Sequence, residues 1–201
     1  GAVIDDVDSD QSVLDAYRGY AKAAEDWART QEVRNEAQRE YEKWGAHLAD
    51  DKVDVPLLPA IGRMDEHFQM SNPVRVLTSG VERRAARPFH ASGKWRMVDR
   101  VAWWDDYRDD VAVVFGHYWR WFDAERGAMF SRGERNLFAG EPPDAWLGPR
   151  RNAFCVDYSV GVRYRERLSR PGLPFLGRLG ALRWPERELV FDDGQVIPAR
   201  G

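Results

Sequence analysis

The feature that most constrains this chain is an uninterrupted apolar run, Val-Ala-Val-Val-Phe, at residues 111–115. Its β-branched residues pack well on a pleated surface, and a continuous apolar run suits a strand that is covered on both faces. The run therefore predicts a buried strand. Gly116 then lets the backbone turn sharply before His117, so we expect an imidazole at the carboxyl end of this strand, where open α/β sheets bind their ligands.

Two later segments predict further parts of a sheet. Residues 152–161 form a second apolar run that ends in polar residues and glycine, which is typical of a buried strand that meets a loop. Residues 177–190 have the pattern of a β-hairpin. The C-terminal half of the chain is therefore expected to be rich in strands.

The order of these segments resembles the C-terminal part of calcineurin-like metallophosphoesterases, in particular the bacterial branch near the serine/threonine phosphatases and the symmetrical diadenosine-tetraphosphate hydrolases. In that family a hydrophobic strand delivers Gly-His, a later strand ends in Ile-Asp-Thr-Gly, and a Leu-Thr-Ala-Leu-Arg-Leu-Pro hairpin closes the sheet. The matching residues are Gly116-His117, Val156-Asp157-Tyr158 (loosely, without the Thr-Gly pair) and Ala181-Leu182-Arg183-Trp184-Pro185. The resemblance covers about residues 74–190.

The resemblance implies an α/β fold: the C-terminal half of a metallophosphoesterase-type β-sandwich flanked by helices, with a long N-terminal helical segment. It also implies hydrolysis of phosphate esters by a metal-bound hydroxide. The family's motifs Asp-x-His, Gly-Asp-x-x-Asp-Arg-Gly and Gly-Asn-His-Glu/Asp do not occur in this sequence. We therefore expect the chain to be the C-terminal portion of a longer or split enzyme, inactive without an N-terminal half that supplies the other metal ligands.

His117 and Arg120 are the residues expected to carry the chemistry. The resemblance implies that His117 is a metal ligand in a dinuclear centre of Mn, Fe or Zn, metals that suit an imidazole in a mixed nitrogen and oxygen shell. A structural or solvent-facing histidine is the alternative. Arg120 is the candidate catalytic residue, because its planar guanidinium can pair bidentately with phosphate oxygens. A salt bridge from Arg120 to a nearby aspartate is equally compatible with the sequence.

Three further residues are candidates for substrate binding. Tyr118 lies beside His117 and either lines a wall of the substrate site or packs in the core. Lys94 and Arg96 follow a glycine where a loop enters a strand, so they either bind an anion or form a solvated basic turn.

The rest of the chain divides into four predicted regions. Residues 1–50 are a helical segment, with apolar residues at spacings of three and four, Asp10 as the N-cap, and one long helix or a helical pair over residues 12–48. Residues 51–73, with several prolines, are an irregular connection. Residues 74–193 are the α/β region and include predicted strands at 74–78 and 97–104. Residues 194–201 are a frayed tail.

The charge and cysteine content of the chain bear on which classes of partner it can have. Lys and Arg number 30 against 33 Asp and Glu, and this net charge of −3 argues against nucleic acid as the main partner and against an anionic membrane surface. A single cysteine, Cys155, cannot form an internal disulfide, which favours a reducing, cytoplasmic setting. The expected partners are the missing N-terminal half, a phosphoester substrate and a second copy bound through the N-terminal helices.

A second function remains open on the same residues. The fold is also compatible with a non-catalytic protein-interaction module that retains the sheet without the metal centre. The acid-rich helical segment and the aromatic content, with nine Trp, seven Tyr and nine Phe, suit a surface that binds a partner protein.

Overall fold

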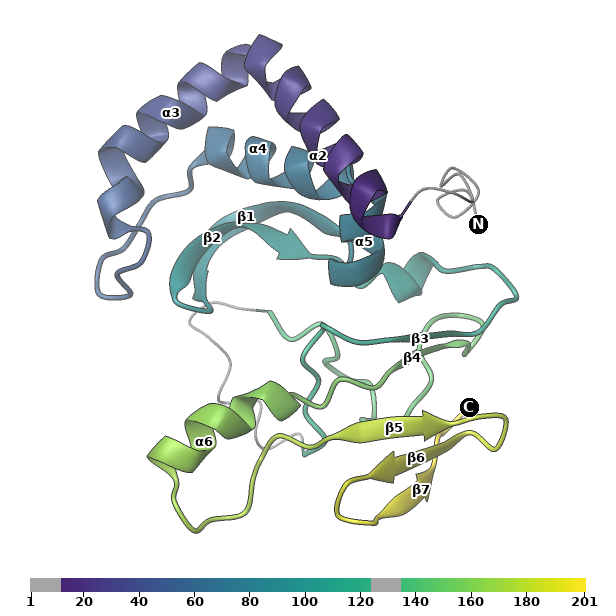
Figure 1. The fold of residues 1–201 in the computed structure, drawn as a ribbon. Helices are drawn as coiled ribbons and strands as arrows, with labels where there is room; N and C mark the ends of the chain where they lie inside the picture. The colour runs from purple at the N-terminus through teal and green to yellow at the C-terminus, as the bar shows by residue number, and fades with distance from the viewer. Residues whose placement is uncertain (1–11, 124–134) are drawn as a thin grey trace. The chain divides into compact units, whose positions relative to one another are not determined.

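The computed structural model describes residues 12–123 and 135–201, which belong to two compact units (Figure 1). Unit 1 comprises Gly1–Val101 and Ser131–Arg135, and unit 2 comprises Ala102–Phe130 and Asn136–Gly201. Helices and small sheets are mixed along the chain, so the α/β class is confirmed in its general sense. The boundary between the units falls inside the segment 74–193 that the sequence suggests is one region.

Among the described residues, unit 1 has helices followed by a two-stranded sheet. Its elements are α2 (Val13–Thr30), α3 (Glu32–Trp44), the 3₁₀ helix η1 (Gly45–His47), α4 (Pro59–Met70), α5 (Pro73–Ser79), β1 (Glu82–Ala91) and β2 (Lys94–Arg100). Of the two arrangements open from the sequence, one long helix or a helical pair, the structure has the pair. Ser12 is the N-cap of α2, since its Oγ accepts a hydrogen bond from the backbone N–H of Asp15 at 3.1 Å. The predicted N-cap, Asp10, lies outside the described residues.

Two segments of unit 1 are helical where the sequence predicts other structure. Residues 59–70 lie in the predicted irregular connection and residues 74–78 in a predicted strand, and both predictions are wrong. Pro59 and Pro73 each occupy the first turn of a helix, where the fixed φ of proline fits and its missing N–H needs no partner. Asn72 caps α5, because its Oδ1 accepts a hydrogen bond from the backbone N–H of the third residue of that helix.

β1 and β2 form an antiparallel hairpin with an irregular middle. Ser92 and Gly93 make its two-residue turn with φ values of 51° and 79°, which match the twist of the flanking strands. The register of the pair shifts between Arg84 and Phe89 on β1. The predicted strand 97–104 is correct up to Arg100, after which the chain leaves the sheet.

The apolar core of unit 1 lies between this hairpin and the helices. Its buried residues are Val55, Leu58, Trp95 and Met97. Figure 1 shows α4 running along the β1–β2 hairpin. Glu40 on α3 fixes the start of α4, because its carboxylate accepts hydrogen bonds from the backbone N–H groups of Ala60 at 3.1 Å and Ile61 at 2.9 Å.

Unit 2 contains a parallel strand pair, a short helix and a three-stranded antiparallel sheet. Its elements are the 3₁₀ helix η2 (Trp103–Asp106), β3 (Val113–Phe115), β4 (Ala153–Cys155), the 3₁₀ helix η4 (Val160–Val162), α6 (Arg163–Ser169), β5 (Gly180–Arg183), β6 (Glu188–Phe191) and β7 (Val196–Pro198). Strand β3 pairs in parallel with β4, and the other sheet has the order β5-β6-β7. The predicted hairpin at 177–190 is confirmed as β5 and β6.

β4 is the most deeply buried strand among the described residues of unit 2. Its residues are fully buried and alternate between two aromatic clusters: Ala153 and Cys155 pack with Trp104, and Phe154 packs with Trp146. The predicted burial of this strand is therefore confirmed.

β3 is less buried than β4. Its second residue, Val114, is 49% exposed, and Val111 just before the strand is 69% exposed. The sequence predicts a strand that is buried throughout, and this part of the prediction is wrong.

The predicted frayed tail is also wrong. β7 pairs with β6, and Ile197 packs against the cluster around Trp146. The backbone of Arg200 closes this part of the unit: its C=O accepts a hydrogen bond from the N–H of Trp146, and its N–H donates to the C=O of Asp144, both at 2.8 Å. This short segment forms a third strand because β6, paired with β5 on one side, offers its other edge to β7.

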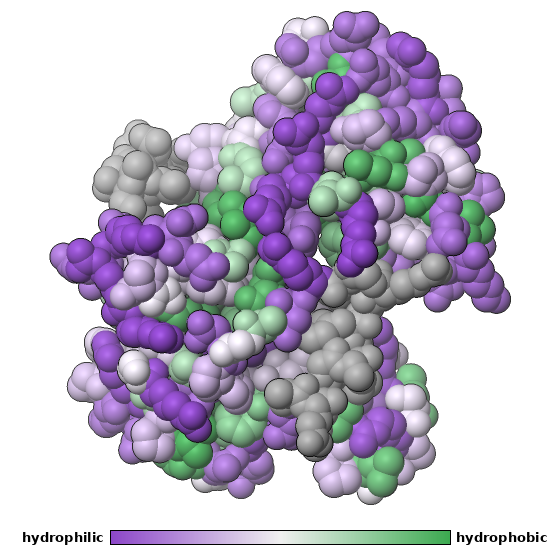
Figure 2. All heavy atoms as spheres, turned by 180° about the vertical axis from the view of Figure 1, so that it is seen from behind, coloured by the Kyte–Doolittle hydropathy of each residue, from purple (hydrophilic) through white to green (hydrophobic). Residues whose placement is uncertain are grey.

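The surface is polar over most of the face seen in Figure 2, where hydrophobic residues occur in small separate groups. This distribution is normal for a folded chain, because polar atoms alone cannot cover a surface. Over the ranges 12–123 and 135–201, no helix is long and apolar enough to cross a bilayer.

Candidate functional site

The loops that follow β3 and β4 meet at one end of unit 2, because parallel strands end at the same edge of a sheet. Gly116 ends β3, and His117 follows it with an exposed side chain and a left-handed backbone, φ 68°. His117 thus lies directly beyond the carboxyl end of a strand.

Asp157, just beyond the end of β4, joins the two loops. Its carboxylate accepts hydrogen bonds from the backbone N–H of His117 (N···Oδ2 2.8 Å) and from that of Ser159 (N···Oδ1 3.0 Å). Its carbonyl oxygen accepts a hydrogen bond from the backbone N–H of Arg120 at 2.8 Å, and the Ser159 hydroxyl donates to the C=O of Arg120 at 3.0 Å. We call His117, Asp157 and Ser159, with the backbone of Arg120, the strand-end site.

Backbone strain is concentrated at the strand-end site. His117, Trp119 and Ser159 all have left-handed φ values, of 68°, 44° and 59°. A non-glycine residue in this region costs on the order of 1 kcal/mol, and such residues cluster at functional loops, where the surrounding structure holds them. The hydrogen bonds to Asp157 are the contacts that hold two of these three residues.

His117 presents an exposed imidazole that could bind a metal at the strand-end site. Among the residues that the structure describes, no group of three or more His, Cys, Asp or Glu side chains could hold a metal ion. The carboxylate of Asp157 is engaged with backbone N–H groups. The described residues therefore offer a single exposed imidazole and do not by themselves fit a metal centre.

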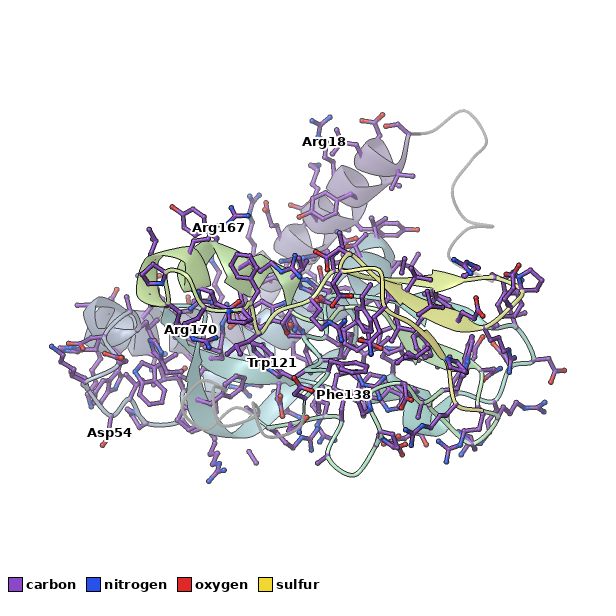
Figure 3. The ribbon with its side chains drawn as sticks, turned by 90° about the horizontal axis from the view of Figure 1, so that it is seen from below. Arg18, Asp54, Trp121, Phe138, Arg167 and Arg170 are labelled. Atoms are coloured by element: carbon purple, nitrogen blue, oxygen red, sulfur yellow. The ribbon has the colours of Figure 1, made fainter. Side chains whose placement is uncertain are left out.

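The side chain of Arg120 faces the interior and not a substrate. It is 1% exposed, and its guanidinium donates hydrogen bonds to the carbonyl oxygens of Pro142 and Ala145. Its guanidinium carbon lies 5.0 Å from the centre of the Phe138 ring, which Figure 3 labels among the crowded interior side chains. Burial lowers the pKa of Arg120. This geometry fits a structural cation that satisfies buried carbonyls better than a phosphate clamp.

Tyr118 packs in the core. It is 6% exposed, and its ring makes edge contacts with Trp104 at 5.3 Å and Phe115 at 5.4 Å between centroids. Of the two roles open from the sequence, the structure supports packing.

Lys94 and Arg96 belong to β2 in unit 1, whereas His117 belongs to unit 2. Lys94 is exposed at the start of the strand, and Arg96 donates from Nε to the C=O of Ala91 at 3.4 Å. Burial raises the pKa of Asp65 on α4, and the positive charges of Lys94 and Arg96 offset part of this increase. These contacts make Lys94 and Arg96 part of the local charge network of unit 1.

Cys155 is buried and inert. Burial raises the pKa of its thiol to about 12, because the thiolate loses its hydration in the aromatic core. No chemistry is therefore expected from this sulfur at neutral pH.

Two residues of the strand-end site were not among the candidates from the sequence. Asp157 and Ser159 lie in a segment that the sequence marks only as a loosely matching strand end. The signal that points to them is the Asp-x-Ser spacing after a buried strand, because an Asp side chain often accepts the N–H two residues later. The hydrogen bond between Asp157 and His117 joins residues 40 positions apart, so no local sequence pattern predicts it.

Comparison of the chain with protein-family models, with curated proteins and with solved structures gave no match.

Proposed function

We propose that unit 2 is the C-terminal portion of a metal-dependent phosphoesterase of the calcineurin-like type, and that His117 contributes one ligand to its metal centre. The observation that carries the proposal is an exposed imidazole held beyond the end of β3 by Asp157 from β4. A ligand must be presented to solvent before a metal can bind, and it must be fixed so that the metal site is preorganised. The strained but hydrogen-bonded backbone at His117 meets both conditions.

The remaining ligands would come from a further polypeptide segment. The unpaired edge of β3 supports this part of the proposal, because among the described residues β3 pairs with β4 alone. A strand added beside β3 would bring its own carboxyl end to the strand-end site. In the completed site, Mn, Fe or Zn ions would supply the activated hydroxide and neutralise charge on the phosphoryl oxygens. The same added strands would complete the metallophosphoesterase-type β-sandwich that the resemblance implies.

The test uses the protein isolated from its natural source with any polypeptide that remains bound. We expect Mn²⁺-dependent hydrolysis of p-nitrophenyl phosphate, lost in His117→Ala and retained in the matched control His47→Ala, whose imidazole is exposed on η1. Activity that is independent of metal, or that survives His117→Ala, contradicts the proposal. As a second readout, Mn²⁺ should broaden the imidazole NMR signals of His117 before those of His47.

A non-catalytic interaction module is the second candidate, and the unpaired edge of β3 and the half-exposed Val114 also favour it. In both cases Val114→Lys should weaken binding of the added polypeptide, because a buried ammonium would be required at the new interface. The two functions differ in hydrolysis: an interaction module binds its partner but shows no metal-dependent turnover with or without His117.

A further inference from the structure

Unit 1 carries a cavity of about 540 Å³ beside the irregular part of β1. Arginines dominate its lining: Arg83, Arg84, Arg87 and Arg135. Its other charged lining residue is Asp99, and its apolar surface includes the buried ring of Phe89. Four cations and one carboxylate around a single cavity give it a strongly positive potential.

The β-bulge of β1 builds this cavity. Arg84 pairs with Val98 and Phe89 pairs with Arg96, so residues 85–88 stand opposite residue 97 alone. The extra residues leave the ladder and bend the strand, which is how bulges redirect side chains near binding sites. Three of the four arginines thus come from one short segment, and Arg135 comes from 48 positions beyond Arg87 along the chain.

Two of the four arginines are already paired. Arg84 lies with its Nε 3.1 Å from a carboxylate oxygen of Glu66, and Arg135 lies with its Nε 3.9 Å from Asp99. Within residues 12–123 and 135–201, the side chains of Arg83 and Arg87 have no carboxylate partner and no hydrogen bond. The cavity therefore carries about two uncompensated positive charges, which match the charge of one phosphate monoester dianion.

We propose that this cavity binds a phosphorylated small molecule, with Arg83 and Arg87 holding the phosphate group. Each guanidinium can donate two parallel hydrogen bonds to a pair of phosphate oxygens. Two arginines therefore suit a doubly charged phosphate group, whereas one positive charge would be enough for a carboxylate. The volume exceeds that of a free phosphate ion and falls in the range of small-molecule sites. The ring of Phe89 supplies apolar surface for the organic part of the ligand.

Calorimetric titration of the full chain in EDTA, at about 50 mM salt, tests the proposal with ADP, inorganic pyrophosphate and an oligothymidylate as probes. We expect ADP to bind at least several-fold more tightly than pyrophosphate, and higher salt to weaken both. Arg83→Gln and Arg87→Gln should each weaken ADP binding by roughly tenfold. Arg39→Gln, an exposed arginine on α3 outside the cavity, is the matched control and should have no effect.

Several results would overturn the proposal. The first is that neither ADP nor pyrophosphate binds at millimolar concentration. The second is that Arg39→Gln weakens ADP binding as much as the cavity variants do. The third is that Arg83→Gln and Arg87→Gln both bind ADP as tightly as the parent chain. Tighter binding of the oligothymidylate than of ADP would identify a nucleic-acid surface instead. Circular dichroism of each variant checks that the fold is retained. His117→Ala should bind ADP like the parent chain, so the outcome is independent of the proposed metal site in unit 2.

Discussion

The carboxylate of Asp157 accepts a hydrogen bond from the backbone N–H of His117 at 2.8 Å, joining the ends of two parallel strands. Asp157→Ala removes the carboxylate that accepts hydrogen bonds from the backbone N–H groups of His117 and Ser159. Both N–H groups must then bond to water, and the left-handed backbone at His117 loses a stabilising contact. We expect the free energy of unfolding of unit 2 to fall by roughly 2 kcal/mol. Urea denaturation measures this change, with Asp106→Ala, an exposed aspartate on η2, as the control that should change stability little.

The same variant tests the proposed metal-binding role of His117. If Asp157 positions His117, hydrolysis by the assembled protein should fall in Asp157→Ala even at temperatures where the variant is folded. Full activity in a folded Asp157→Ala protein would show that the hydrogen bond is structural only.

Arg120→Met should destabilise unit 2 by about 3 kcal/mol, because a buried cation and its hydrogen bonds to two carbonyl oxygens are lost while side-chain volume is nearly kept. Chemical denaturation measures the loss. Arg165→Met on the exposed side of α6 is the control, with an expected change within about 0.5 kcal/mol. A folded and equally stable Arg120→Met protein would contradict the structural role of Arg120 and restore the phosphate clamp as the better interpretation.

Cys155 should resist alkylation in the native protein. With its pKa raised to about 12 by burial, roughly one molecule in ten thousand carries the thiolate at pH 8. Iodoacetamide followed by mass spectrometry should find the thiol unmodified in buffer and fully modified in denaturant. Rapid modification under native conditions would mean that the cluster around Trp104 opens readily.

The stability of unit 1 should depend on pH through Glu82. Burial raises the pKa of this half-buried carboxyl, against the opposing effect of Arg100 and other nearby arginines. A folded-state pKa above the unfolded one favours the folded state when the group is protonated. The contribution of Glu82 to stability is therefore full below the ordinary glutamate pKa and is lost as the pH rises through the folded-state pKa.

The measurement compares the parent chain with Glu82→Gln by urea unfolding between pH 4 and pH 7. Relative to this variant, the parent should lose stability as the pH rises. Glu32→Gln at the exposed start of α3 should give a nearly parallel curve. A parent chain that gains stability relative to Glu82→Gln over the same range would reverse the sign of the argument.

Local patterns in the sequence predict much of the fold. Short-range periodicity predicts the helical segment over residues 12–48, as one helix or a pair, and the hairpin at 177–190, and the structure has a helical pair and a hairpin there. Strand β1 escapes prediction because Pro88 and the bulge break its alternation of apolar and polar residues. Residues 74–78 are misjudged because β-branched residues suggest a strand, while the cap at Asn72 and the proline after it favour a helix.

The candidate site is only partly predictable, for a different reason. The position of His117 after a strand depends on neighbouring residues and follows from the sequence. The burial of Arg120 depends on carbonyl oxygens 22 and 25 residues later, and the arginine cavity of unit 1 depends on a bulge and a distant segment. Such contacts are properties of the tertiary structure, and no local spacing encodes them.

The backbone of Arg200 is bonded to both Asp144 and Trp146, so the final residues are part of the folded body of unit 2. Deleting them would strip main-chain partners from a buried segment and open a path for water to an indole that is otherwise sealed.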